Sequence, residues 1–120
     1  MQSTYDLIVR ALKPRLENID ILTVKETFAT WELIPIVRDK VLVGVALRKQ
    51  AELHIIIDPS YQNTICFIKQ AKQIVNETIA KYNYAETTVA DSHNMGHRLA
   101  KILGFSVTDS SNNIVSYKKE

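Results

Sequence analysis

The sequence is poor in cysteine and in charge of one sign. Cys66 is the single cysteine among 120 residues, which excludes an intrachain disulfide and a metal site built from several thiolates. Fifteen Lys and Arg residues stand against 13 Asp and Glu residues, so the formal net charge is only +2. This balance favours neither a nucleic acid nor a membrane surface as the partner. We expect a protein of a reducing, cytoplasmic compartment.

Long apolar runs are missing as well. The richest apolar window, residues 31–47, is interrupted by the charged residues 38–40. Asp6 and Arg10 interrupt the N-terminal stretch before it reaches the length of a signal peptide. We therefore expect no membrane-spanning segment and no secretion signal. Without internal repeats, low-complexity runs or linkers, a chain of this length predicts a single domain, residues 1–120.

Apolar spacing in the first half of the chain predicts a helix followed by strands. A helical pattern covers residues 4–12, and Pro14 ends or kinks it. β-branched and aromatic residues predict three strands, at residues 27–37, 41–48 and 51–58. The short connections between these strands predict an antiparallel meander, although the first turn contains no glycine. We assign Phe28 and Trp31, in the first of these strands, to the core.

The second half of the chain alternates between the two periods. Residues 63–83 have the 3.6-residue period of a long helix. The remaining predicted elements are a strand at 84–90, a helix at 95–103 and a closing strand pair over 105–117 about the polar turn 109–113. A strand, a long helix and a strand predict a right-handed crossover between parallel neighbours. The fold class expected is α/β (α+β), a mixed sheet with an antiparallel meander, then a parallel βαβ pair, and helices on both faces.

Two features of the predicted sheet could carry chemistry. The segment 59–63 leads from a strand into the long helix, whose unpaired N–H groups and positive dipole end could hold an anion such as a pyrophosphate. The alternative is that Asn63 only caps this helix. Strand alternation places Glu52 and His54 on one face, where an imidazole could remove a proton from an amine. The alternative for these two residues is an ordinary, partly exposed strand face.

His93 and His97 are the remaining candidates for a metal site. They are four residues apart, so both would lie on one face of a helix and could chelate a metal ion. No acidic or thiolate third ligand lies near them in the sequence. We therefore expect no metal.

The order of the elements and two motifs bring a family into view. The segments Ile57-Asp-Pro-Ser-Tyr-Gln62 and Ala100-Lys-Ile-Leu-Gly-Phe105 resemble motifs of the GNAT acetyltransferase superfamily, and the resemblance extends over residues 31–117. It implies an acetyl-CoA-dependent N-acetyltransferase that acts on a small-molecule or protein amine. The candidate bases from strand alternation are Glu52 and His54, although counting back from Ile57 as in the family leads to Ala51 instead. The resemblance also implies a set of cofactor-binding residues, namely Ile56, Ile57, Gln62, Asn63, Thr64 and Asn94.

The sequence departs from the family pattern at the chemically important positions. Ile65 and Phe67 occupy places where the family has small residues around the pyrophosphate, and they would crowd it. His93 and Ala100 stand where the family often has Asn and Tyr. The alternative is therefore a non-catalytic domain of the same fold that acts through protein contacts. Residues 84–117 also resemble small GNAT-like proteins of short-tailed bacteriophages. The candidate protein partners are therefore a virion protein, a host protein or, in a homodimer, a second copy of this chain.

Overall fold

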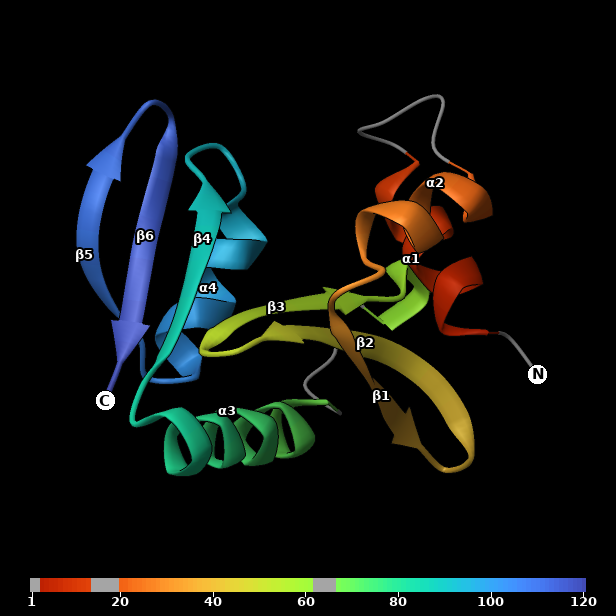
Figure 1. Cartoon of the computed structure of the whole chain (residues 1–120), viewed down its shortest axis with the longest axis horizontal. Helices are drawn as coiled ribbons and strands as arrows, with labels where there is room; N and C mark the ends of the chain where they lie inside the picture. The colour runs from red at the N-terminus through yellow and green to blue at the C-terminus, as the bar shows by residue number, and fades with distance from the viewer. Residues whose placement is uncertain (1–2, 14–19, 62–66) are drawn as a thin grey trace.

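The computed structural model describes residues 3–13, 20–61 and 67–120, which form one mixed sheet with helices on both faces (Figure 1). The strands are β1 (Glu32–Arg38), β2 (Val41–Lys49), β3 (Glu52–Ile57), β4 (Ala85–Ala90), β5 (Ser106–Ser111) and β6 (Ile114–Lys119). The helices are α1 (Thr4–Leu12), α2 (Ile21–Thr27), α3 (Ile68–Tyr82) and α4 (Asn94–Ile102), with a short 3-10 turn, η1 (Pro59–Tyr61). The strand order is β1-β2-β3-β4-β6-β5, and only β3 and β4 pair in parallel. The predicted fold class is confirmed.

The N-terminal region contains one helix that the apolar spacing predicted and one that it missed. α1 begins after Ser3, whose side-chain oxygen accepts from the N–H of Asp6. α2 begins after Asp20, which accepts from the N–H of Thr23 at 2.8 Å. The strand predicted from residue 27 is therefore wrong in its first five residues, because these residues end α2 and form the turn into β1.

Two of the three hairpin turns, β1–β2 and β5–β6, have the same backbone conformation and contain no glycine. Asp39 and Lys40 have φ angles of 51° and 66°, and Asn112 and Asn113 have φ angles of 54° and 65°. Two successive residues of positive φ form the turn whose twist matches that of paired strands. Pairing in the β5–β6 hairpin extends to Ser111, so the predicted turn 109–113 is too long. Its first three residues belong to β5.

The predicted long helix is confirmed. In the described residues it begins at Ile68, after the non-helical Phe67. α3 follows Phe67 and ends at Asn83, which adopts the left-handed conformation (φ 75°) typical of a helix C-terminus. The interpretation of Asn63 as its N-cap falls outside the described residues, as do Gln62 and Thr64. None of the helices in the described ranges is long and apolar enough to cross a membrane.

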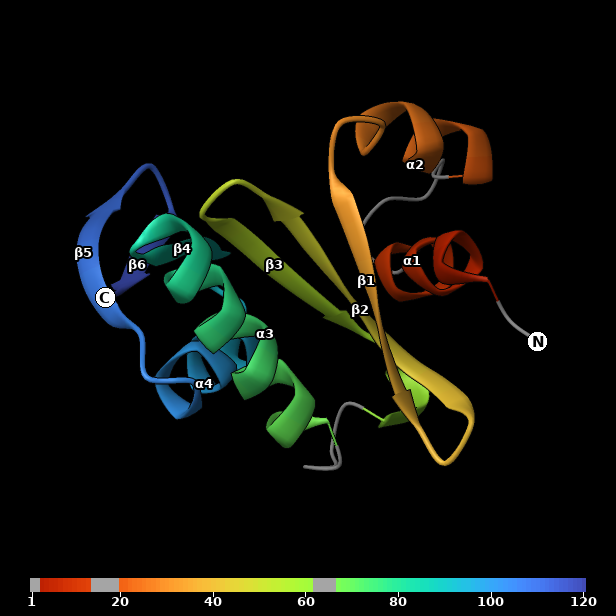
Figure 2. The same ribbon diagram turned by 60° about the horizontal axis from the view of Figure 1, so that its bottom comes forward.

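Helices cover both faces of the sheet (Figure 2), and they bury two separate apolar clusters. On one face, α1 and α2 pack on β2 through the α1/α2 cluster, which consists of Leu7, Ile8, Val24, Val45 and Leu47. On the other face, α3 and α4 pack on the sheet through the larger α3/α4 cluster, which includes Leu53, Ile57, Ala71, Val75, Leu103 and Phe105. Alternate residues of β3 therefore belong to different layers, as strand alternation predicts.

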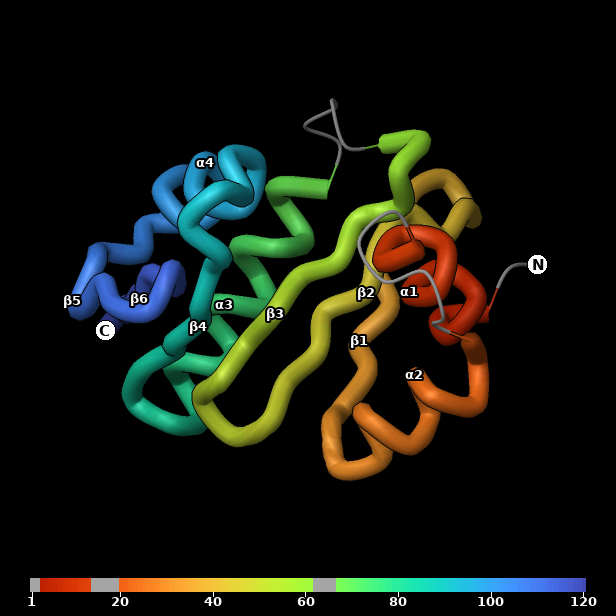
Figure 3. Tube along the Cα trace, turned by 90° about the horizontal axis from the view of Figure 1, so that it is seen from above, coloured from red at the N-terminus to blue at the C-terminus, as the bar shows by residue number. Residues whose placement is uncertain are grey.

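The sheet opens between its two parallel strands. β3 and β4 pair at one position only, Glu52 opposite Glu86, and the N–H of Glu86 donates to the carbonyl of Ala51 at 2.9 Å. Beyond this point the strands diverge (Figure 3). By contrast, the antiparallel pairs on either side, β2 with β3 and β4 with β6, continue over six positions each. The predicted parallel pair is confirmed, and its early end positions the site described below.

Candidate functional site

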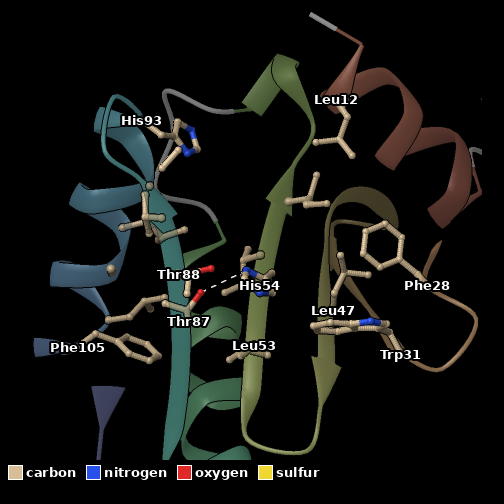
Figure 4. Close-up of a pocket in the computed structure, with 18 residues that line it drawn as sticks. Leu12, Phe28, Trp31, Leu47, Leu53, His54, Thr87, Thr88, His93 and Phe105 are labelled. Carbon is tan, nitrogen blue, oxygen red and sulfur yellow. Dashed lines mark hydrogen bonds between the residues drawn. The ribbon is translucent and has the colours of Figure 1, made fainter. Parts of the chain in front are cut away.

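A pocket of about 380 Å3 lies where β3 and β4 separate (Figure 4). One side is formed by β4, by α4 and by residues that flank α4, including Thr87 on β4, His93 before α4 and Phe105 after it. β3 crosses its middle, and the other side is formed by apolar residues from α1, β2 and the turn before β1, namely Leu12, Phe28, Trp31 and Leu47. Its lining thus includes members of both apolar clusters, because the gap passes through the sheet.

His54 lies in the middle of this gap. Its Nε2 is 2.8 Å from Oε2 of Glu52, and its Nδ1 is 3.4 Å from Oγ1 of Thr87 on β4. A carboxylate only accepts, so Nε2 carries the hydrogen and Nδ1 of the neutral ring keeps its lone pair. This lone pair faces the gap, where the hydroxyl of Thr87 approaches it at a long distance (Figure 4). The side chains of His54 and Glu52 are 29% and 41% exposed, so both are within reach of a ligand.

Sequence alternation therefore placed Glu52 and His54 on the same face correctly, and the structure adds that their side chains are joined by a hydrogen bond. It also adds two neighbours that the sequence pattern did not bring together. Thr87 approaches His54 across the gap, and the ring of Trp31 lies 5.6 Å from the imidazole, centroid to centroid. Trp31 and Phe28 do pack against the α1/α2 cluster as predicted, but they are only half-buried and also line the pocket.

The backbone of β3 presents hydrogen-bond donors to the gap at alternate residues. The N–H of Asp58 donates to the carbonyl of Val43 on β2 at 2.8 Å, and Ile56 lies opposite Val45 in the same antiparallel register. N–H directions alternate along a strand, so the N–H of Ile56 points to β2 and those of Ile55 and Ile57 point to the gap. Ile56 contributes its side chain to the pocket. Ile57 has its side chain buried on the other face.

The helix on the far side of the pocket places His93, rather than Asn94, against the cavity. Asn94 begins α4, is exposed and does not line the pocket, whereas His93 does. Gly96 makes this approach feasible, because a Cβ at this position would lie 2.7 Å from Nδ1 of His93 and 2.6 Å from Cγ1 of Val89. The small residue thus lets α4 lie close to β4.

The geometry of His97 does not support a metal site on α4. Its Nδ1 is 2.8 Å from the hydroxyl of Tyr117, and its Nε2 is 3.0 Å from the carbonyl of Asp91. Both ring nitrogens are therefore engaged in hydrogen bonds that hold α4 to the sheet. Within residues 3–13, 20–61 and 67–120, no three His, Cys, Asp or Glu side chains are grouped so that they could hold a metal ion.

Solved structures share this arrangement of strands and helices, although no family model and no curated protein matches the chain. A GNAT family acetyltransferase from Elizabethkingia anophelis with acetyl-CoA bound is 16% identical, with a TM-score of 0.71 over 100% of this chain and 92% of that one. The ribosomal-protein-alanine N-acetyltransferase from Brucella melitensis is 12% identical, with a TM-score of 0.71 over 96% and 90%. A Bacillus subtilis acetyltransferase in complex with CoA is 13% identical, with a TM-score of 0.68 over 98% and 93%. The chain has the GNAT fold.

The residues that depart from the GNAT sequence pattern differ in their position relative to the pocket. Phe67 is buried in the α3/α4 cluster and does not line the pocket, so its ring leaves the gap between β3 and β4 open. Ala100 lies on the wall that α4 contributes, where a small side chain leaves room. Ile65 lies outside the described residues. In the described part of the chain, the departures therefore do not close the cavity.

Proposed function

We propose that the chain is an N-acetyltransferase that transfers the acetyl group of acetyl-CoA to an amine. The observation that carries this proposal is the open gap between β3 and β4 with His54 at its centre, hydrogen-bonded through Nε2 to Glu52. The acetyl-CoA bound to the structurally similar protein from Elizabethkingia anophelis supports the choice of acyl donor. A gap filled by side chains would instead have favoured a non-catalytic domain of the same fold.

The cavity fits the reactive part of this donor. About 380 Å3 is enough for an acetyl thioester and part of its pantetheine arm, and the N–H groups of Ile55 and Ile57 point into the gap. These groups would donate to the carbonyl oxygen of the acyl group and hold its orientation. When bound, acetyl-CoA supplies an acyl group that is activated as a thioester.

His54 would act on the amine. Its Nδ1 faces the gap with a lone pair and can accept the proton that the amine loses as its nitrogen bonds to the acetyl carbon. The C–S bond of the thioester would then break, and coenzyme A would leave as a thiolate that takes up the proton held by His54. Glu52 accepts the hydrogen on Nε2, which fixes the tautomer and stabilises the ring once it becomes positively charged. Thr87, at 3.4 Å from Nδ1, is held weakly enough for an amine to take its place.

Titration calorimetry with acetyl-CoA, followed by an assay for free thiol with amine acceptors, tests this function. We expect saturable binding, and we expect His54→Gln to lower kcat by about 100-fold or more while the KM for acetyl-CoA stays within about 2-fold. Glu52→Gln should lower kcat less, because the imidazole remains. Glu86→Gln is the matched control, since this exposed carboxylate lies opposite Glu52 in the sheet, whereas the hydrogen bond to His54 comes from Glu52. A protein that binds no acetyl-CoA would favour the alternative, a non-catalytic domain of the same fold.

A further inference from the structure

We propose that the amine acceptor is a primary amine on a short chain that ends in a flat aromatic ring, seated against Trp31 and Phe28. This inference deepens the proposed function and rests on it. The acceptor would enter from the α1/α2 face of the sheet, where these two side chains line the pocket beyond His54 (Figure 4). The ring would contact the aromatic wall, and the nitrogen would reach Nδ1 of His54.

The aromatic wall is ordered by its own contacts and still offers surface to a ligand. The rings of Phe28 and Trp31 lie 6.1 Å apart, centroid to centroid, at an interplanar angle of 83°. This edge-to-face geometry is a favourable one for aromatic pairs. Both side chains are only half-buried, with Leu12 and Leu47 beside them in the pocket lining. A third ring placed here would extend the aromatic contacts that the protein has already formed.

The distance from this wall to the base suits a short linker. The Trp31 ring and the His54 imidazole are separated by 5.6 Å, centroid to centroid, so they border the same part of the cavity. One or two carbons between a ring and an amine span about 2.5–4 Å. A ring in contact with Trp31 would therefore place its nitrogen next to the imidazole, from which the gap leads on to Nδ1 and Thr87, whereas a long flexible chain would have to fold within the cavity.

The charges around the pocket narrow the class of acceptor further. None of the described residues that line it is an Asp, Glu, Lys or Arg. Its lining would leave the second ammonium of a diamine, or the carboxylate of an amino acid, without an opposite charge, which is costly in an apolar site. Lys49 also places its Nζ over the Trp31 ring, 6.0 Å from the centroid, and would repel a second cation there. Glu52, bonded to His54, can attract the single ammonium of the acceptor.

Trp31 is the only tryptophan in the chain, so its fluorescence reports occupancy of this wall without any need for catalysis. We would titrate the full-length protein with 2-phenylethylamine, with its saturated analogue 2-cyclohexylethylamine, and with putrescine as the diamine. We expect a saturable fluorescence change with 2-phenylethylamine at a concentration about 3- to 10-fold lower than with the saturated analogue. Putrescine should bind about 100-fold more weakly than 2-phenylethylamine. Equal affinity for the three amines would overturn the proposal.

Variants separate this proposal from the proposed function. Phe28→Leu keeps the fluorophore, and we expect it to raise the KM for 2-phenylethylamine about 5-fold or more while kcat and the KM for acetyl-CoA change by less than about 2-fold. Thermal unfolding of the same variant checks that it folds. Acetylation of other amines without any fluorescence change would overturn the aromatic acceptor and leave the acetyltransferase standing. A saturable fluorescence change without acetyl transfer would overturn the proposed function and keep the binding site.

Discussion

Arg48 offers a test of how the sheet is held to α3. Its guanidinium is buried, with 4% of the side chain exposed, and its Nε donates to Oε2 of Glu32 at 2.6 Å. Its Nη1 donates to Oε1 of Glu77 at 3.0 Å and to Oγ1 of Thr78 at 3.2 Å. Since Arg48 is on β2, Glu32 on β1 and the other two on α3, one side chain joins three elements.

A double-mutant cycle with Glu32→Gln and Arg48→Met measures this contact. Hydrogen bonds between charged groups contribute about 1.5–3 kcal/mol. Glu32 is 51% exposed, so solvent screens part of this interaction, and we expect a coupling free energy of about 1–2 kcal/mol between Glu32 and Arg48 at pH 7. Met retains most of the apolar stem of Arg48, so the cycle isolates the charged contact from the packing of the stem.

The coupling free energy between Glu32 and Arg48 should decrease as the pH falls. The hydrogen bond from Arg48, and then its charge, hold the pKa of Glu32 below its usual value, while the same hydrogen bond raises the pKa of Arg48. A carboxyl with a lowered pKa in the folded state stabilises that state fully above its unfolded pKa and loses this contribution as the pH falls through the folded one. The stabilisation is therefore present at pH 7, and we expect it to fade below about pH 4.

Urea unfolding of the four proteins in the cycle, at about pH 7 and about pH 3, checks both statements. The coupling should fall to about 0.5 kcal/mol or less at the lower pH. A control cycle with Lys118→Met and Glu120→Gln, an exposed ion pair of 3.3 Å, should give less than about 0.5 kcal/mol at both. A coupling at Arg48 no larger than this control, or one that grows as the pH falls, would refute the reasoning.

Further outcomes follow from backbone geometry and packing. Gly44→Ala should cost about 1–3 kcal/mol in urea unfolding, because the new Cβ would lie 2.9 Å from the carbonyl oxygen of Ile56. Gly96→Ala should also destabilise, by about 1–2 kcal/mol, because its Cβ would lie 2.6 Å from Cγ1 of the stiff, buried Val89 and the gain in helix propensity offsets only part of this clash. Lys40→Gly should raise the free energy of unfolding by about 0.5–1 kcal/mol, since it removes a side chain at a φ of 66°. Leu7→Ala should cost about 2–4 kcal/mol, because this fully buried side chain joins α1 to the sheet. A shift in Tm of opposite sign in any of these would contradict its stated cause.

Much of the fold could be read from local patterns. The 3.6-residue period located α3, and alternation along residues 52–57 assigned the polar and apolar faces of β3 correctly. α2 escaped because its seven residues are too few to show a period and contain β-branched residues typical of strands. Its start depends on a single side chain, the Asp20 cap, which a search for periodicity does not detect.

The candidate site was less predictable, since it depends on where two distant strands stop pairing. Sequence alternation brought Glu52 and His54 together, but nothing local in 85–90 indicates that the parallel ladder ends after one position. Thr87 and Trp31 reach His54 only because of that early end and of the turn that follows α2. Their roles are properties of the tertiary arrangement, and residues of their type are common in strands and cores.

The early end of the ladder also links the fold to the proposed chemistry. A strand in the middle of a sheet normally has its N–H groups paired on both sides, and each unpaired group in an apolar site costs free energy. β3 keeps its pairing to β2 over six positions but directs the N–H groups of Ile55, which lines the cavity, and of Ile57 away from β2, toward the gap. A ligand with a carbonyl group would satisfy these donors, next to a base whose lone pair faces the same space. Under the proposed function, the feature that weakens the sheet therefore prepares the gap for an acyl group.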